Sequence, residues 1–261
     1  MLRAPALRSF AYAPWPALFA LAMAGLILSA WSAGGATLPA FCGAGTARAL
    51  RELGWPDAAA LVFALNPPGG LLADWAVMLL AMMPPLLAPA LMHVWRSSLP
   101  QRRARGTACF VLGYAALWMA AGPILIGLAL LLQLVAGEAA LAFAGALSLA
   151  IVWSASPWQR IAINRSHRLR RIGLFGWAAD RDCLTFGAIH ALWCMVSCWA
   201  WMLAALTAGP WHIAAMMLTA AIMLAERLAP PQQPRWRLPL LLSPAVHWPT
   251  FASQRNVVRH G

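Results

Sequence analysis

The sequence predicts an all-α protein that forms a polytopic transmembrane helical bundle of about six spans. Hydrophobic residues make up 62% of the 261 positions and charged residues only 10%, which is too apolar for an ordinary soluble domain. Several apolar runs approach the length of about 20 residues that a helix needs to cross a bilayer. Most of the arginines stand between these runs or beyond them, as they do in multi-span proteins.

The expected spans follow one another with short connections. They cover approximately residues 15–33, 74–94, 107–134, 139–154, 183–206 and 211–228. The first follows a basic start with Arg3 and Arg8, as in a signal peptide. Its apolar part is nearer to a full span, so we expect an uncleaved first span.

Prolines and glycines predict breaks inside two of the spans. Pro84, Pro85 and Pro89 are expected to kink or break the second span, because proline lacks an N–H and clashes with the preceding turn. Gly122 and Pro123 are expected to interrupt the third. Such breaks persist in a membrane only where neighbouring groups satisfy the freed carbonyls.

The remaining segments are more polar. A short amphipathic helix is expected at 45–54 and a turn at 67–70, and residues 157–182 are expected to form a basic loop. The tail from Pro230 is expected to be disordered or to lie on the membrane surface. The predicted organisation is a first span with an extracytoplasmic loop (1–72), a five-span membrane domain (74–229) and a basic cytoplasmic tail (230–261).

The distribution of arginine predicts the orientation. With six spans, 17 of the 19 arginines fall on one side and only Arg48 and Arg51 on the other. Because positive charge stays cytoplasmic, both termini are expected in the cytoplasm, with the chain a multi-pass protein of a bacterial inner membrane. Membrane orientation therefore explains the net charge of +12, and no nucleic-acid partner is expected.

One predicted span carries groups that can bind a metal. His190, Cys194 and Cys198 follow at steps of four, which places them on one helix face. Adjacent members are about 6 Å apart along the axis and the outer two about 12 Å, so a complete site needs ligands from another span. Thiolate and thioether ligands favour Cu(I) or Zn²⁺. The candidates on neighbouring spans are Met82, Met83, His212 and Met216.

The same residues have a simpler explanation. Cysteine often packs as a small hydrophobe, and a single histidine in a span can satisfy itself on a backbone carbonyl. A disulfide between Cys194 and Cys198 is not expected, since their Cβ vectors run parallel, whereas an exposed Cys42 could pair with another chain. Asp74, Glu138 and Glu226 are expected to be solvated at span ends or turns.

Motifs of common enzymes are missing from the sequence. It contains no Walker loop, no nucleotide-binding glycine fingerprint, no Ser/His/Asp order and no carboxylate pair placed for acid–base work. Nothing therefore argues for an enzyme. A small-substrate permease is also disfavoured, because the spans offer few polar residues for a pathway.

Residues from about 74 to 227 resemble a bacterial family of predicted metal-binding integral membrane proteins, a domain of unknown function. The resemblance rests on Trp75, Met78, Met82, Met83 and Pro85, on Gly187, His190, Cys194, Cys198, Trp199 and Met202, and on Gly209, Met216, Glu226 and Arg227. The chain departs from the family where cysteines are usual, at Ala162, Ser166 and Ser197, and has His212 in place of an asparagine.

Two functions are expected from these observations. The first is an inner-membrane protein that binds a soft transition metal, copper before zinc, inside the bundle for delivery or sensing, with another membrane or periplasmic protein as partner. The alternative is a non-catalytic structural subunit of a larger membrane complex. In that case the tryptophan-rich surface and the proline-broken second span would be contact surfaces.

Overall fold

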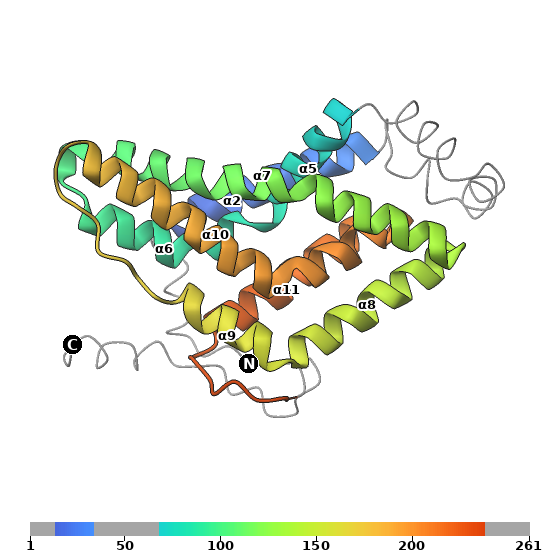
Figure 1. Cartoon of the computed structure of the whole chain (residues 1–261). Coiled ribbons are helices and arrows are strands. Elements are labelled where there is room, and N and C mark those ends of the chain that lie inside the picture. Colours follow the sequence, from blue (N-terminus) through green and yellow to red (C-terminus); the bar gives the residue numbers. More distant parts are fainter. Residues whose placement is uncertain (1–13, 34–67, 238–261) are drawn as a thin grey trace.

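The computed structural model describes residues 14–33 and 68–237 (Figure 1). These residues form eight α-helices and no strand, which confirms the all-α prediction. The helices are α2 (Trp15–Ala33), α5 (Pro68–Met82), α6 (Pro84–Ser97), α7 (Arg103–Ala136), α8 (Ala139–Ala155), α9 (Pro157–Ser166), α10 (Gly176–Thr207) and α11 (His212–Leu228). The predicted amphipathic helix at 45–54 and Cys42 lie outside the described residues.

Three helices are long and apolar enough to cross a membrane, or five if each of two bent helix pairs counts as one span. The single helices are α7 with its preceding 3-10 turn, α10, and α11 with its preceding 3-10 turn. The bent pairs are α5 with α6 and α8 with α9, while α2 is a shorter apolar helix. The chain therefore has the character of a multi-pass membrane protein, and a count of six stays a prediction.

The expected break in the second span is confirmed at Pro84 and Pro85, whereas Pro89 lies inside the continuous helix α6. α5 and α6 meet at an angle of 69° around Met83, with Pro84 and Pro85 opening α6. Proline is tolerated there because the first turn of a helix needs no N–H partner. Pro68 likewise opens α5, so Pro68, Gly69 and Gly70 belong to a helix and not to the predicted turn.

The expected interruption of the third span is wrong, because α7 continues through Pro123 from Arg103 to Ala136. The neighbouring Gly122 instead makes room for a side chain. A Cβ atom there would lie 2.6 Å from Cδ1 of Trp75, whose indole Nε1 donates to the Trp118 carbonyl at 2.9 Å. Packing of α5 on α7 thus accounts for this glycine.

The predicted basic loop at 157–182 is also wrong in its extent. Residues 157–166 form α9, and residues from Gly176 onward belong to α10. The Ser156 hydroxyl accepts from the Gln159 N–H at 3.3 Å and Pro157 stands at the first helical position, a favourable helix start. The arginines suggested a loop, yet α9 buries one side through residues such as Gln159, Ala162 and Ile163.

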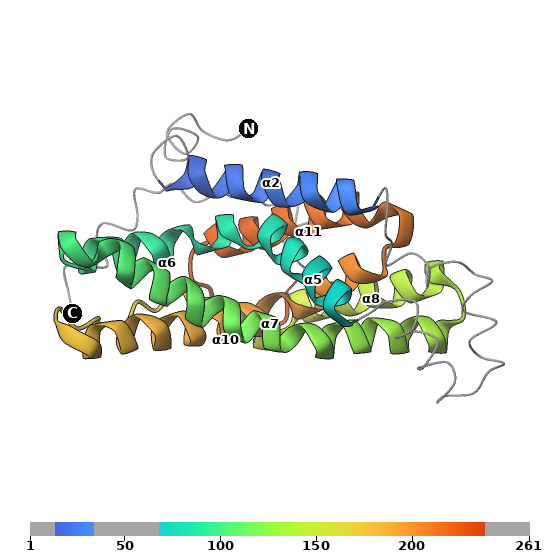
Figure 2. The same cartoon turned by 90° about the horizontal axis from the view of Figure 1, so that it is seen from above.

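The helices pack in layers. In Figure 2, α7 and α10 run side by side, α2 lies on the opposite side of the molecule, and α5, α6 and α11 lie between. Two glycines allow the close approach of α7 and α10. A Cβ on Gly113 would overlap the Leu184 carbonyl, and one on Gly187 would overlap the Phe110 carbonyl. Small residues at helix interfaces are typical of membrane bundles.

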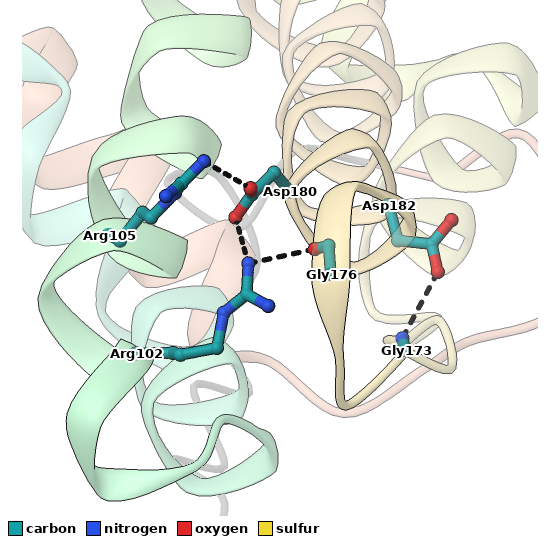
Figure 3. A network of polar contacts seen from close by, with 6 residues as sticks. All are labelled: Arg102, Arg105, Gly173, Gly176, Asp180 and Asp182. Carbon is teal, nitrogen blue, oxygen red and sulfur yellow. Dashed lines mark hydrogen bonds and ion pairs between the residues drawn. The ribbon is translucent and has the colours of Figure 1, made fainter.

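The arginine-rich connections meet at one end of the bundle, where α7 and α10 begin (Figures 1 and 3). Arg102 donates to the Gly176 carbonyl at 2.8 Å and to Asp180 at 2.6 Å, and Arg105 pairs with the other oxygen of Asp180 at 2.7 Å. Asp182 accepts from the Gly173 N–H at 3.0 Å. These contacts clamp the start of α10 onto the start of α7.

The first part of the predicted tail is packed against the bundle. Asn164 donates through its side-chain amide to the Gln232 carbonyl at 2.7 Å, and the Arg237 N–H donates to the Ala155 carbonyl at 3.1 Å. Residues 230–237 therefore lie on α9 and the end of α8. The prediction for the rest of the tail falls outside the described residues.

Candidate metal centre

Two buried thiols face the interior of the bundle from the middle of α10. The Sγ atoms of Cys194 and Cys198 lie 4.0 Å apart, and both residues are at most 3% exposed. This separation is about twice the length of a disulfide bond, and both thiols are free. The Cys198 thiol donates to the Cys194 carbonyl at 2.8 Å, which holds its side chain back along the helix.

A tyrosine joins these thiols to a methionine of another helix pair. The Tyr114 hydroxyl of α7 lies 3.2 Å from Cys194 Sγ and donates to Met83 Sδ at 3.3 Å. Tyr114 and Met83 are both buried. The phenol thus contacts one sulfur atom of α10 and one at the bend between α5 and α6, and Cys198 Sγ lies next to the first.

Local sequence explains why these groups converge. Met83 occupies the break that Pro84 and Pro85 impose, so its side chain is presented at the corner of a bent span. Tyr114 follows Gly113, one of the two glycines at which α7 and α10 approach closely, and Cys194 lies two turns beyond the other, Gly187. The close helix approach brings the phenol within hydrogen-bonding distance of the thiol.

His190 lies one turn before Cys194 and is 6% exposed. Its ring packs against Phe110, Tyr114 and Phe186, with ring centroids 5.9 to 6.2 Å apart. The Nε2 atom is buried and has no hydrogen-bond partner in the described part of the chain. The Nε2 atom of this packed ring is therefore available to bind a ligand from outside the protein.

The other predicted ligands interact elsewhere. Met216 Sδ accepts from the Ser29 hydroxyl at 3.8 Å, and His212 Nδ1 is 2.7 Å from the Ala205 carbonyl. Met82 is buried in the core beside Met83. Within residues 14–33 and 68–237, no hydrogen bond joins any of these three side chains to Cys194 or Cys198.

A buried polar network lies beside the thiols, and the sequence analysis did not foresee it. The Gln159 amide donates to Glu226 at 2.7 Å, to Ser154 at 3.3 Å and to the Ser197 carbonyl at 3.3 Å. Glu226 is 2% exposed, so the expectation of a solvated carboxylate at a span end is wrong. α9 packs on α10 and covers Glu226 of α11 through the side chain of Gln159.

Arg227 connects this network to the sulfur atoms. Its guanidinium donates to the Ser197 hydroxyl at 3.4 Å, and Ser197 directly precedes Cys198 on α10. Cys198, Glu226 and Arg227 also line a cavity of about 10 Å³, which is near the size that holds one water molecule. Charged groups are therefore within reach of the thiols although all of them are buried.

Two signals in the sequence could have revealed the missed residues. Tyr114 is one of only two tyrosines, and a phenol in the middle of an apolar helix needs a polar partner. Gln159 follows Ser156 and Pro157, a helix-start pattern, so it belongs to a helix and not to a loop.

The donor set fits a soft ion better than a hard one. Among the described residues, no group of three or more histidine, cysteine or acidic side chains is placed to hold a metal. Two thiols and a thioether are instead the ligands that Cu(I) prefers. The fold and this site define a helical membrane protein with a buried cluster of sulfur atoms.

The comparison with protein families agrees with this description. Residues 72–244 match the PpoB2 family, described as a copper chaperone, and the chain belongs to that family. No curated protein and no solved structure matches the chain. The sequence suggested a family of metal-binding membrane proteins, and the family match assigns the chain to a copper-related family.

Proposed function

We propose that this protein carries Cu(I) as cargo on Cys194 and Cys198, with Met83 as a third sulfur ligand and Tyr114 as the group that orients Cys194. The observation that carries the proposal is the pair of buried Sγ atoms 4.0 Å apart, linked through one phenol to the Met83 thioether. Membership of a copper chaperone family supports the identity of the ion.

The charges around the thiols favour Cu(I) over Zn²⁺. Arg160 and Arg227 are both buried, whereas Glu226 is the buried carboxylate of this network, so with Glu226 ionised one positive charge is left over. A buried charge without compensation is costly. Cu(I) bound by two thiolates carries one negative charge and would offset it, while Zn²⁺ bound by two thiolates is neutral.

The proposed site leaves out Met82, His212 and Met216. The two residues of α11 have partners on other elements, and Met82 belongs to the core. We keep His190 outside the loaded site as well, because its ring packs in an aromatic cage one turn away. The ion would therefore be held by sulfur from α10 and from the α5–α6 bend.

The setting that suits such a carrier is a bacterial inner membrane, with both termini in the cytoplasm. Support comes from the arginine-rich ends of α6, α7, α9 and α10, which meet at one end of the bundle. A copper chaperone hands its ion to another protein, and we propose a membrane or periplasmic acceptor. Exposed tryptophans such as Trp31, Trp177 and Trp211 suit the membrane interface.

The test is a Cu(I) titration of the detergent-purified chain under reducing, anaerobic conditions, against a chromogenic Cu(I) chelator. We expect the wild-type protein to compete for Cu(I) and to prefer it to Zn²⁺. Cys194→Ser/Cys198→Ser should lose this competition. The matched control is Cys109→Ser/Cys183→Ser, which removes two thiols from the same bundle and should bind as the wild type does.

X-ray absorption of the loaded protein should show copper bound by sulfur, with one sulfur fewer in Met83→Leu. Equal copper binding by both double-cysteine variants would overturn the proposal. It would then favour the structural-subunit function, which co-purification of partner chains in fixed stoichiometry would support.

A further inference from the structure

We propose that a second site, formed by Arg165, Arg168 and Arg170 beside His190, binds the phosphate group of an anionic ligand. The site is a pocket of about 220 Å³ between α10 and the segment that follows α9. The three arginines form its basic side, and Phe186, His190 and Trp193 of α10 form the other. It is separate from the sulfur site, and nothing in the copper proposal requires it.

The positive charge of this pocket is not neutralised by the protein. In the part of the chain that the structure describes, the ion pairs are those of Arg102 and Arg105 with Asp180. The next acidic residue along the chain is Asp182, and its carboxylate accepts from the Gly173 N–H and forms no ion pair with an arginine of the pocket. Three neighbouring guanidinium groups without a carboxylate attract an anion, and arginine matches the geometry of phosphate oxygens.

The arginines are held in position by the fold. The Arg165 guanidinium lies over the Trp193 ring, 4.7 Å from its centroid, which orients it along the pocket wall. The ring of His93 on α6 bonds to the Arg170 carbonyl at 2.7 Å and thereby anchors the segment that carries Arg168 and Arg170. The pocket is thus lined by α9, α10 and the segment between them, and α6 anchors that segment.

His190 supplies the second observation. Its ring lines the pocket, is 94% buried, and retains an Nε2 atom without a partner in the described residues. An imidazole N–H can donate to an oxyanion, and burial makes an unused polar atom costly. A bound phosphate group would add charge-assisted hydrogen bonds from the arginines.

A phosphate group can reach this pocket from a lipid headgroup or from a soluble phosphate compound. The first arm of the test compares nanodiscs of phosphatidylcholine alone with nanodiscs that contain phosphatidylglycerol, and native mass spectrometry counts the lipids retained. The second arm titrates inorganic phosphate and pyrophosphate into the detergent-solubilised chain in chloride buffer. Retention of phosphatidylglycerol alone identifies a lipid site, and saturable phosphate binding identifies a soluble ligand.

The test variant is Arg168→Gln/Arg170→Gln. The matched control, Arg235→Gln/Arg237→Gln, removes the same charge from exposed positions that do not line the pocket. Losing one charge-assisted hydrogen bond raises the dissociation constant by about tenfold. We therefore expect the test variant to bind the phosphate group at least about tenfold more weakly. The control should bind as the wild type does, and added salt should weaken binding in both.

Unchanged thermal unfolding of the test variant in ligand-free buffer shows that the fold is intact. If that variant unfolds, Arg165→Gln serves as the second variant, because its guanidinium is exposed on the ring of Trp193. Equal binding by the test and control variants in both arms, or no binding by the wild type in either, would overturn the proposal.

Discussion

Tyr114 is the residue on which the geometry of the sulfur site depends. Its hydroxyl lies between Cys194 Sγ and Met83 Sδ, which come from different elements. A buried hydroxyl that serves two sulfur atoms fixes the separation of both from the ring. The phenyl ring alone would fill the same space without setting that distance.

Tyr114→Phe should therefore weaken Cu(I) binding without unfolding the bundle. When Cys194 is a thiolate, the single O–H of Tyr114 would donate to its Sγ instead of to Met83 Sδ. Losing that hydrogen bond is expected to reduce affinity by about tenfold, the equivalent of about 1.4 kcal/mol. Competition with the chromogenic chelator measures this change. The control Thr219→Val removes a hydroxyl that bonds within α11, and should leave affinity unchanged. Equal affinities in the two variants would exclude Tyr114 from the site.

His167 makes stability depend on pH. Burial lowers the pKa of His167 below its ordinary value of 6.5, although a bond to the Arg227 carbonyl acts in the opposite direction. The unfolded chain therefore binds the proton more readily than the folded one. The stability from neutral His167 is fully present above 6.5 and is lost as the pH falls from 6.5 towards the lowered value.

The melting temperature of the wild-type protein should thus fall more on acidification than that of His167→Gln. The glutamine keeps a donor for the Arg227 carbonyl but does not titrate. Thermal unfolding in detergent at neutral pH and below 6.5 measures the difference. Parallel decreases in the two proteins would show that other groups control the acid sensitivity.

At the scale of helices, the pair α7–α10 positions the site because glycines let the two backbones approach. Gly113 lies against the Leu184 carbonyl and Gly187 against the Phe110 carbonyl. Neither position has space for a methyl group, so a larger residue must push the helices apart. The distance between Tyr114 and Cys194 depends directly on this separation.

Gly113→Ala should destabilise the protein by about 1–3 kcal/mol, the usual cost of overpacking, and should also weaken Cu(I) binding. Gly127→Ala is the matched control on the same helix, since a Cβ atom there meets nothing within 4 Å. Alanine also favours a helix over glycine, so this control should be neutral or slightly stabilising. Thermal unfolding and Cu(I) competition measure both effects. A harmless Gly113→Ala would contradict the close approach.

The two bent helix pairs bring further side chains to the thiols through bends in the chain, and not through close approach of two helices. The break at Met83 turns α6 away from α5 by 69° and leaves a methionine at the corner. The break after Ala155 turns α9 across α10 and α11, which buries Gln159 and Glu226 beside the thiols. Each bend replaces a straight span with a corner that brings side chains close to the thiols.

At the scale of the whole molecule, the arginines form a polarised end. The clamp of Arg102 and Arg105 on Asp180 lies there, and so does the contact of His93 with the Arg170 carbonyl. The proposed phosphate pocket extends from the segment that His93 anchors to the middle of α10. Because positively charged connections stay on the cytoplasmic side of a membrane, such a molecule would be oriented with this end in the cytoplasm.

This orientation predicts the outcome of reporter fusions. A fluorescent protein that matures only in the cytoplasm should be bright when fused to the C-terminus. Alkaline phosphatase fused after Glu138, in the turn between α7 and α8 at the opposite end, should be active. Fusion of the phosphatase after Gln101, before α7, is the control and should be inactive. The reverse pattern would place the arginine-rich end outside.

Much of the architecture followed from hydrophobic periodicity and charge. The apolar runs at 107–134, 139–154 and 183–206 all became helices, and the prolines at 84 and 85 did break a span. The continuous α7 through Pro123 did not follow, because packing partners outweighed the local signal of the proline. The helical start of the segment 157–182 did not follow either, because its arginines suggested a loop although Ser156 and Pro157 form a helix start. Helix propensity predicts a helix poorly wherever tertiary contacts compensate for a residue that disfavours helix formation.

The sequence by itself determined that this chain is a helical membrane protein and that Cys194 and Cys198 share one helix face, because a four-residue step on a helix is enough to align them. Only the tertiary structure decided which other groups meet them. It brought Tyr114 and Met83 to the thiols and directed His212 and Met216 elsewhere. The reason is that contacts between helices depend on crossing geometry, which glycines and proline bends set across distant parts of the chain.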